Sequence, residues 1–191
     1  MEERIVGIIP HLLKSTGYAK SRQYILIVTD RRLIVAQITA QMMEEMRNQS
    51  KIRAQQGKRG MFGGLLAGKV LSIVDIVEFS NRYWAMAPDQ IVMETPGNLA
   101  LDIGSISVAA VQHQYAERDE DSSITVDWYV LDLVSTQGSY SFNFDADPQD
   151  MNVLRSVLGG RLVGDGRPNP IRPASTGLAF EQGYPPPPPP P

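Results

Sequence analysis

Residues 24–37 read YILIVTDRRLIVAQ and contain the strongest structural signal in the chain. Two runs rich in β-branched residues, Tyr24–Val28 and Leu33–Gln37, flank the polar tetrapeptide Thr29–Arg32. Apolar runs of this length joined by four polar residues are typical of two antiparallel strands and their turn. The stretch therefore predicts a β-hairpin. The other segments are interpreted by their position before or after this hairpin.

An apolar run precedes the hairpin and helical patterns follow it. The run Ile5–Leu13 predicts a strand, and Pro10 inside it favours an edge strand because proline cannot donate a ladder hydrogen bond. Residues 39–56 are rich in helix formers, with Thr39 as the N-cap. A second helix is predicted over 65–83 from a stripe at three- and four-residue spacing, formed by Leu66, Val70, Ile73, Val74 and Val77. Pro88 predicts the start of a third, short helix.

The C-terminal half returns to strand patterns and ends in a helix. The predicted strands are Leu99–Ile103, Ile106–Tyr115, Ile124–Val134 and Ser139–Phe144. Asp147 and Pro148 are typical of the first positions of a helix. Its buried stripe is predicted to be Met151, Leu154, Val157 and Leu158. Residues 165–191 are dominated by Gly, Pro, Ser and Asn and are predicted to be a disordered, proline-rich tail.

Composition limits the class of protein. The 191 residues are 42% hydrophobic and 20% charged, which is typical of a globular domain with one core. The chain has no cysteine, which excludes disulfides, thiolate metal sites and cysteine nucleophiles. We see no signal peptide and no run of about eighteen apolar residues. These features predict a cytoplasmic protein, with peripheral contact to a membrane left open.

Charge is distributed unevenly along the chain. Residues 1–69 carry twelve Lys or Arg and five Asp or Glu, whereas residues 70–191 carry six and sixteen. The net charge of −3 is unlike that of a wholly basic nucleic-acid binder, so no nucleic-acid partner is expected.

The order of the predicted elements resembles that of pleckstrin-homology domains, and the residues 29–34, Thr-Asp-Arg-Arg-Leu-Ile, resemble the same hairpin in GRAM and prokaryotic pleckstrin-homology-like domains. A second likeness is the ending, Tyr129–Leu133 and Tyr140–Phe144 followed by a helix. The resemblance covers about 1–38 and 98–163. It implies an α+β fold: a seven-stranded bent barrel with a C-terminal capping helix. The domain would span 1–164, with a helical insertion at 39–95, after strand 3, that departs from the family pattern.

Two sets of residues are candidate binding sites. The resemblance implies an anion or lipid site at Lys14, Lys20 and Arg22, because lipid-binding members carry basic residues at this place; the alternative is three cations on a solvated loop. A second set is Arg53, Lys58, Arg59, Met61 and Phe62, where cations adjoin apolar residues. That segment predicts a docked insert, a membrane contact or a self-association surface. Residues 63–69 resemble a phosphate-binding loop, but Val70 replaces the Ser or Thr that would bind magnesium.

No constellation of nucleophile, acid and base residues is visible, and no metal-ligand spacing occurs, so we expect neither an enzyme nor a cofactor. The sequence predicts a non-catalytic binding or adaptor module that recruits a protein partner. The alternative is a peripheral membrane module that contacts anionic lipid through its basic residues. The polyproline run 185–191 predicts either a ligand for a polyproline-binding domain or a spacer.

Overall fold

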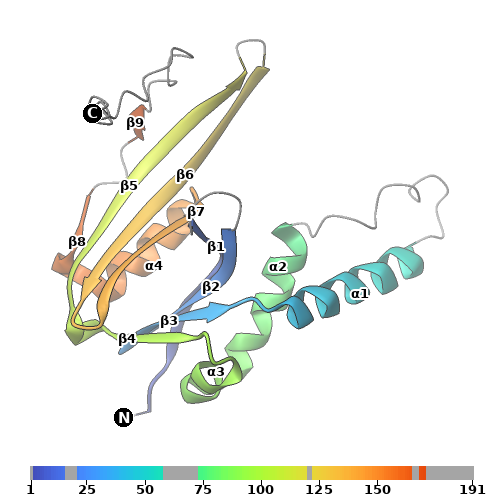
Figure 1. Cartoon of the computed structure of the whole chain (residues 1–191), viewed down its shortest axis with the longest axis horizontal. Coiled ribbons are helices and arrows are strands. Elements are labelled where there is room, and N and C mark those ends of the chain that lie inside the picture. Colours follow the sequence, from blue (N-terminus) through green and yellow to red (C-terminus); the bar gives the residue numbers. More distant parts are fainter. Residues whose placement is uncertain (1, 16–20, 58–72, 120–121, 165–167, 171–191) are drawn as a thin grey trace, which may run out of the picture.

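The computed structural model describes residues 2–15, 21–57, 73–119, 122–164 and 168–170, and the mixed α+β class is confirmed (Figure 1). The strands are β1 (Ile5–Ser15), β2 (Ser21–Thr29), β3 (Arg32–Gln37), β4 (Leu99–Asp102), β5 (Ile106–Asp119), β6 (Ser122–Ser135), β7 (Gly138–Asp145), β8 (Leu162–Val163) and β9 (Pro168–Pro170). The helices are α1 (Ala40–Gly57), α2 (Ile73–Ser80), α3 (Pro88–Glu94) and α4 (Pro148–Leu158), with short 3₁₀ turns η1 (Asn81–Ala85), η2 (Ile103–Ser105) and η3 (Gly159–Arg161).

The predicted hairpin is confirmed as β2 and β3, which pair antiparallel from Tyr24 opposite Gln37 to Val28 opposite Leu33. The buried Thr29 closes the turn. Its hydroxyl accepts the backbone N–H groups of Arg31 (3.1 Å) and Arg32 (2.7 Å). A polar side chain that binds backbone donors in this way replaces the ladder bonds that the turn lacks.

All the strands belong to one sheet, in the order β4-β3-β2-β1-β7-β6-β5-β8, and β9 also pairs with β5. The expected edge position of β1 is wrong, because β1 pairs with β2 on one side and with β7 on the other. Pro10 is tolerated there because it falls in a register shift between Ile9 and Leu12, where regular ladder pairing with β2 is interrupted.

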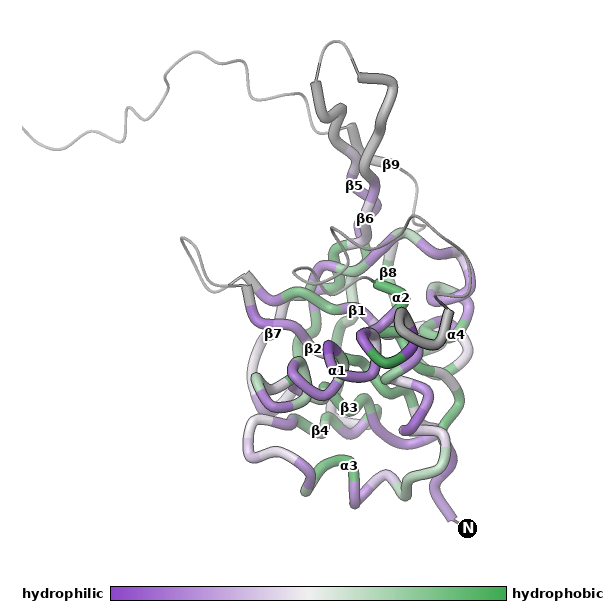
Figure 2. The backbone as a smooth tube through the Cα atoms, turned by 90° about the vertical axis from the view of Figure 1, so that its right-hand side faces the viewer, coloured by the Kyte–Doolittle hydropathy of each residue, from purple (hydrophilic) through white to green (hydrophobic). Residues whose placement is uncertain are grey.

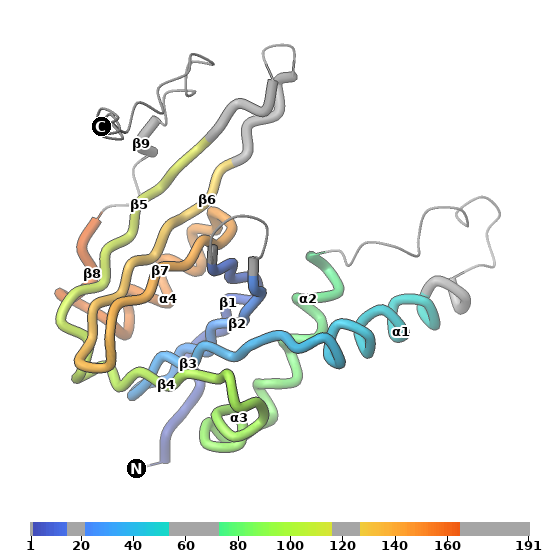
Figure 3. The backbone as a smooth tube through the Cα atoms, in the orientation of Figure 1, coloured from blue at the N-terminus to red at the C-terminus, as the bar shows by residue number. Residues whose placement is uncertain are grey.

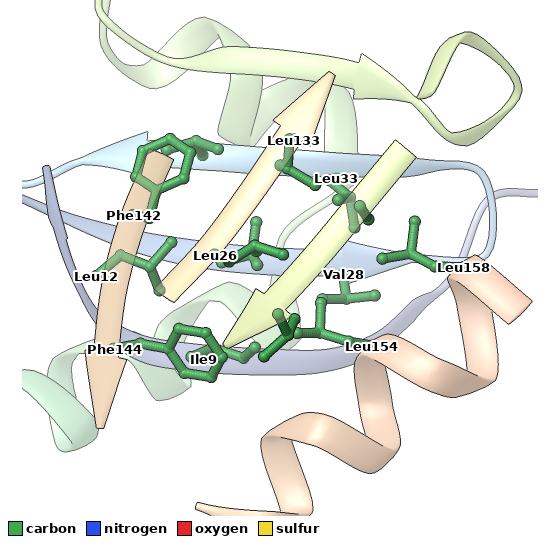
Figure 4. Packing of buried hydrophobic residues seen from close by; sticks show 14 of the residues in the cluster. Ile9, Leu12, Leu26, Val28, Leu33, Leu133, Phe142, Phe144, Leu154 and Leu158 are labelled. Carbon is green, nitrogen blue, oxygen red and sulfur yellow. The ribbon is translucent and has the colours of Figure 1, made fainter. Parts of the chain in front are cut away.

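The main core lies between two groups of strands. Strands β1–β4 and β5–β7 cross, and their apolar side chains meet between them (Figure 4). Strand alternation assigns one face of each of the strands β1–β7 to this core, as Tyr140, Phe142 and Phe144 of β7 show. The fully or nearly fully buried members include Ile9, Leu12, Leu26, Val28, Leu33, Leu101, Leu131, Leu133 and Phe142.

Helix α4 completes this core and begins where the sequence predicts. The Asp147 carboxylate accepts the backbone N–H of Gln149 at 2.7 Å, as an N-cap does. Gly159 ends the helix with a φ of 53°, a conformation that glycine adopts without steric cost. Leu154 and Leu158 reach the strands from the side of the crossing (Figure 4).

The described part of the insert packs on the outer face of β2 and β3. Helix α1 leaves the end of β3, and α2 and α3 return towards β4 (Figure 3). A second core joins β2, β3 and the residue after β3 to the helices through Ile25, Ile27, Ile34, Ala36, Ile38, Met42, Met46, Ile76, Phe79, Tyr83 and Ile91. Thr39 caps α1 as predicted, accepting the N–H of Met42 at 3.2 Å.

The predicted apolar stripe of the second helix is wrong over the part that the structure describes. Helix α2 buries Ile76 and Phe79, whereas Ile73, Val74 and Val77 are 52%, 63% and 39% exposed. Both faces of this segment carry apolar residues at helical spacing, so periodicity gives two solutions. The side that packs is the one carrying Phe79, the largest apolar side chain of the helix.

Strands β5 and β6 extend beyond the rest of the sheet as a long hairpin (Figure 2). Strands β8 and β9 pair parallel with β5, and β9 lies inside the segment for which we predicted disorder. Gly164 follows β8 with a φ of 102°, and a Cβ there would come within 2.1 Å of the Val111 carbonyl oxygen, so this close approach to β5 requires glycine. The rest of the predicted tail lies outside the described residues.

Candidate functional site

The antiparallel register places Lys14 directly opposite Arg22 at the ends of β1 and β2. Directly opposed residues have Cβ atoms about 4.5–5.5 Å apart and lie on the same face of the sheet. Two residues earlier, Leu12 lies opposite Tyr24, and both belong to the main core. Lys14 and Arg22 therefore continue the inner face to its open end. Lys20, the third predicted member, lies outside the described residues.

The Lys14 ammonium lies beside an aromatic side chain. Its nitrogen lies over the Tyr140 ring, 5.6 Å from the centroid, which is within range of a cation–π interaction. A hollow of about 220 Å³ adjoins it, lined by Lys14, Tyr24, Val35, Gly97, Asn98, Leu99, Tyr140 and Phe142. The hollow thus offers a charged donor beside apolar walls. Tyr140 is not recognisable as a site residue from the sequence, because no local pattern indicates that β7 pairs with β1.

The charges of Lys14 and Arg22 are not neutralised by any carboxylate in the part of the chain that the structure describes. Other cations of the chain are paired: Arg32 with Glu3, Arg47 with Glu44, Arg53 with Glu78, and Arg82 with Glu94. Like charges that face each other across two strands repel. An anion bound between Lys14 and Arg22 would remove this repulsion and gain charge-assisted hydrogen bonds.

Arg53 is the only member of the second predicted set that lies among the described residues. Its guanidinium forms an ion pair with Glu78 of α2, so it links two helices of the insert. Lys58, Arg59, Met61 and Phe62 lie outside the described residues. The nearby described surface is apolar: Ile52 of α1 is exposed, as are Ile73, Val74 and Val77 of α2.

Arg32, from the hairpin motif, has a structural role. Its Nε donates to Glu3 at 3.0 Å, and a terminal nitrogen donates to Asp89 of α3 at 2.6 Å. Hydrogen bonds from Arg32 are the main cause that lowers the pKa of Glu3, with a further bond from Thr29. These contacts tie the N-terminal residues and the insert to the hairpin, and they engage Nε and one terminal nitrogen of Arg32 in structural hydrogen bonds.

The described residues contain no group of three or more His, Asp or Glu side chains that could hold a metal ion. Within the same residues, no helix is long and apolar enough to cross a bilayer. The polyproline run 185–191 lies outside them. No family model matches the chain, and the comparisons with curated proteins and with solved structures also give no match.

Proposed function

We propose that the protein is a non-catalytic binding module that recruits a protein partner by holding an acidic segment of it at the open end of the sheet. The observation that carries this proposal is the facing pair Lys14 and Arg22, which has no carboxylate partner among the described residues and whose Lys14 lines an aromatic hollow. Arg offers a planar fork of donors and Lys a compact charge, a combination suited to carboxylate or phosphate groups.

We also propose a pleckstrin-homology-like architecture for residues 1–164, with 39–95 as a helical insertion. Its support is the order β4-β3-β2-β1-β7-β6-β5 together with the helix α4 that directly follows β7. In such a bent sheet the helix covers one open end. The facing pair then lies at the mouth formed by the ends of β1 and β2, where a ligand can approach without displacing α4.

Magnitudes favour directional binding of an anionic group over diffuse attraction to an anionic lipid surface. A cation near an anionic membrane contributes about 1 kcal/mol, so Lys14 and Arg22 contribute about 2 kcal/mol, well short of the roughly 4 kcal/mol of even millimolar binding. Contacts within a hollow are stronger, at about 1.5–3 kcal/mol for each hydrogen bond to a charged group. The pair is therefore better suited to directional recognition than to diffuse attraction.

A peripheral membrane module is the second candidate function. The observation that favours it is the exposed aliphatic surface of Ile52, Ile73, Val74 and Val77, near the cation Lys51 of α1. Apolar side chains beside a cation can enter the interface of an anionic bilayer.

Co-sedimentation of the full chain with neutral and with anionic liposomes, at low and at high salt, separates the two functions. The first function predicts no pelleting with either lipid. Pelleting with anionic liposomes that is lost in Ile73→Ser/Val74→Ser, and retained in Lys14→Gln/Arg22→Gln, would support the membrane function through the insert. Pelleting that depends on Lys14 and Arg22 would replace the acidic protein segment by a lipid headgroup as the ligand of the facing pair.

A further inference from the structure

A second hollow, of about 240 Å³, lies where β1, β6 and β7 meet. Its lining includes the aromatic side chains Trp128 and Phe144, the carboxylates Asp127 and Asp145, and the polar side chains His11 and Asn143. No lysine or arginine lines it, which is the reverse of the Lys14 hollow. The two hollows therefore differ in the sign of the charge that they would attract.

The two carboxylates retain capacity to bind a ligand. Asp127 lies 3.2 Å from Nε2 of His113, and Asp145 lies 3.5 Å from Nδ1 of His11, so each touches one imidazole. Both side chains are more than half exposed, at 54% and 57%, and a carboxylate has about four lone-pair positions. Nδ1 of His11 is itself buried without a hydrogen-bond partner, because its distance to Asp145 is too long.

The surrounding charges add to a negative potential at this place. Two residues separate β7 from helix α4, which has Asp147 as its N-cap and Asp150 in its first turn. Burial raises the pKa of Asp150 to about 7, and repulsion from Asp147 and Asp145 adds to the rise.

We propose that this hollow binds a lysine or arginine side chain of a protein partner. The apolar wall formed by Trp128 and Phe144 would cover the methylene stem of such a side chain, and the Trp128 face attracts a cation. Asp127 and Asp145 would accept its N–H groups. A carboxylate exposed to water attracts every kind of cation. A hollow that combines apolar walls with two carboxylates binds a cation more strongly when it is carried on an aliphatic chain.

This site is independent of the proposed acidic ligand of Lys14 and Arg22. The two hollows draw on some of the same strands, but no residue lines both of them. Failure of either proposal leaves the other standing. If both hold, the module recognises a partner surface that carries charges of both signs.

The test is a nuclear magnetic resonance titration of the full chain, with the indole N–H of Trp128 as reporter and that of Trp84, on η1, as internal control. The probes are n-butylammonium and n-butylguanidinium, compared with sodium butyrate and n-butanol of equal chain length. We expect the two cations to shift the Trp128 signal to saturation, with dissociation constants on the order of 1–10 mM, as for fragments of this size. Butyrate and butanol should leave the signal in place.

The double variant Asp127→Asn/Asp145→Asn should weaken cation binding at least about tenfold, a loss of about 1.4 kcal/mol. The matched double variant Asp102→Asn/Asp132→Asn removes equal charge elsewhere on the sheet and should bind as the wild type does. If Asp145→Asn disturbs the spectrum as a whole, the single variant Asp127→Asn replaces it. The proposal is overturned by an unmoved Trp128 signal, by equal shifts with butanol, or by undiminished binding in the folded variant.

Discussion

Lys14 and Arg22 face each other across β1 and β2 although both are cations. Such a pair weakens a sheet by roughly 0.2–1 kcal/mol compared with a neutral pair. Tyr140, under the Lys14 ammonium, offsets part of this cost and also keeps the side chain on the inner face of the sheet. Lys14 and Arg22 thus repel each other and have no carboxylate partner in the described residues. Two such cations suit an anion site, because a bound anion would relieve their repulsion.

Replacement of one cation of the pair should therefore not destabilise the protein. We expect Arg22→Gln to leave the free energy of unfolding unchanged or to raise it by about 0.5 kcal/mol, because the repulsion disappears. Urea denaturation measures this change. A loss above about 1 kcal/mol would contradict the interpretation, since a loss of that size indicates a structural contact of Arg22.

Replacement of Arg32 should have the opposite effect. Arg32→Gln leaves Glu3, whose side chain is only 12% exposed, without its main partner. We expect a loss of about 2–3 kcal/mol, less than for a fully buried pair because Arg32 is partly in contact with water.

The pH dependence of the Arg32 effect follows from Glu3. The pair holds the pKa of Glu3 below its usual value of 4.5, so its stabilisation is present above pH 4.5 and is lost as the pH falls through the lowered pKa. Urea denaturation at pH 7 and at pH 3 measures the difference in the free energy of unfolding between the wild type and Arg32→Gln. We expect this difference to be smaller at pH 3. An equal difference at both values would show that lost packing, and not the ion pair, causes the effect.

Asp150 should make stability decline as pH rises. Its pKa is about 7 in the folded chain against a usual value of 3.8, so the folded state holds a proton that the unfolded state releases between these values. The carboxyl group therefore stabilises the fold below about pH 4, and this contribution is lost as the pH rises through 7. The helix dipole at the first turn of α4 favours the charged form and reduces the effect.

Asp150→Asn should therefore be more stable than the wild type at pH 8, by about 1–2 kcal/mol after allowance for solvent around this partly exposed group, and equally stable at pH 4. Thermal or urea denaturation at the two pH values measures this. Asp102→Asn, on β4, is the control and should show no such divergence. If the variant were less stable than the wild type at pH 8, the Asp150 carboxylate would form a stabilising ion pair, which would contradict this prediction.

Docking of the insert depends on Phe79, which is 6% exposed and packs against the outer face of β2 and β3. We expect Phe79→Ala to cost about 3–5 kcal/mol locally and to increase hydrogen exchange in α2 and α3 while β5–β7 stay protected. Met93→Ala, at a side chain that is 76% exposed, is the control and should change neither. Unchanged exchange in α2 of the Phe79 variant would contradict the second core.

The elements of the fold that could be predicted are those whose turn or cap residues lie within the element's own sequence. The hairpin at 24–37 and α4 each carry their own turn or cap residues, Thr29 and Asp147, so their positions agree with the sequence. Pro10 was misread because its missing donor falls at a register shift that only tertiary pairing creates. The face of α2 was misread because either side could serve as the apolar one.

The candidate site divides in the same way. Lys14 and Arg22 come together because a hairpin register follows from strands that are close in sequence. Tyr140 and Asp145 lie near β1 because their strand, β7, pairs with β1. The two strands are more than a hundred residues apart in the sequence, and no local pattern predicts that they pair. The acidic hollow, assembled from β1, β6 and β7, was invisible for the same reason.

The anion site at Lys14 and Arg22 can be tested by fluorescence anisotropy of a labelled, glutamate-rich peptide. The peptide is titrated with the full chain, with its Lys14→Gln/Arg22→Gln variant and with the matched variant Arg47→Gln/Lys51→Gln. We expect binding that weakens at high salt, falls at least about tenfold in the first variant and is retained in the second variant, which has the same net charge as the first. Equal weakening in both variants, or no weakening in the first, would contradict an anion site at Lys14 and Arg22.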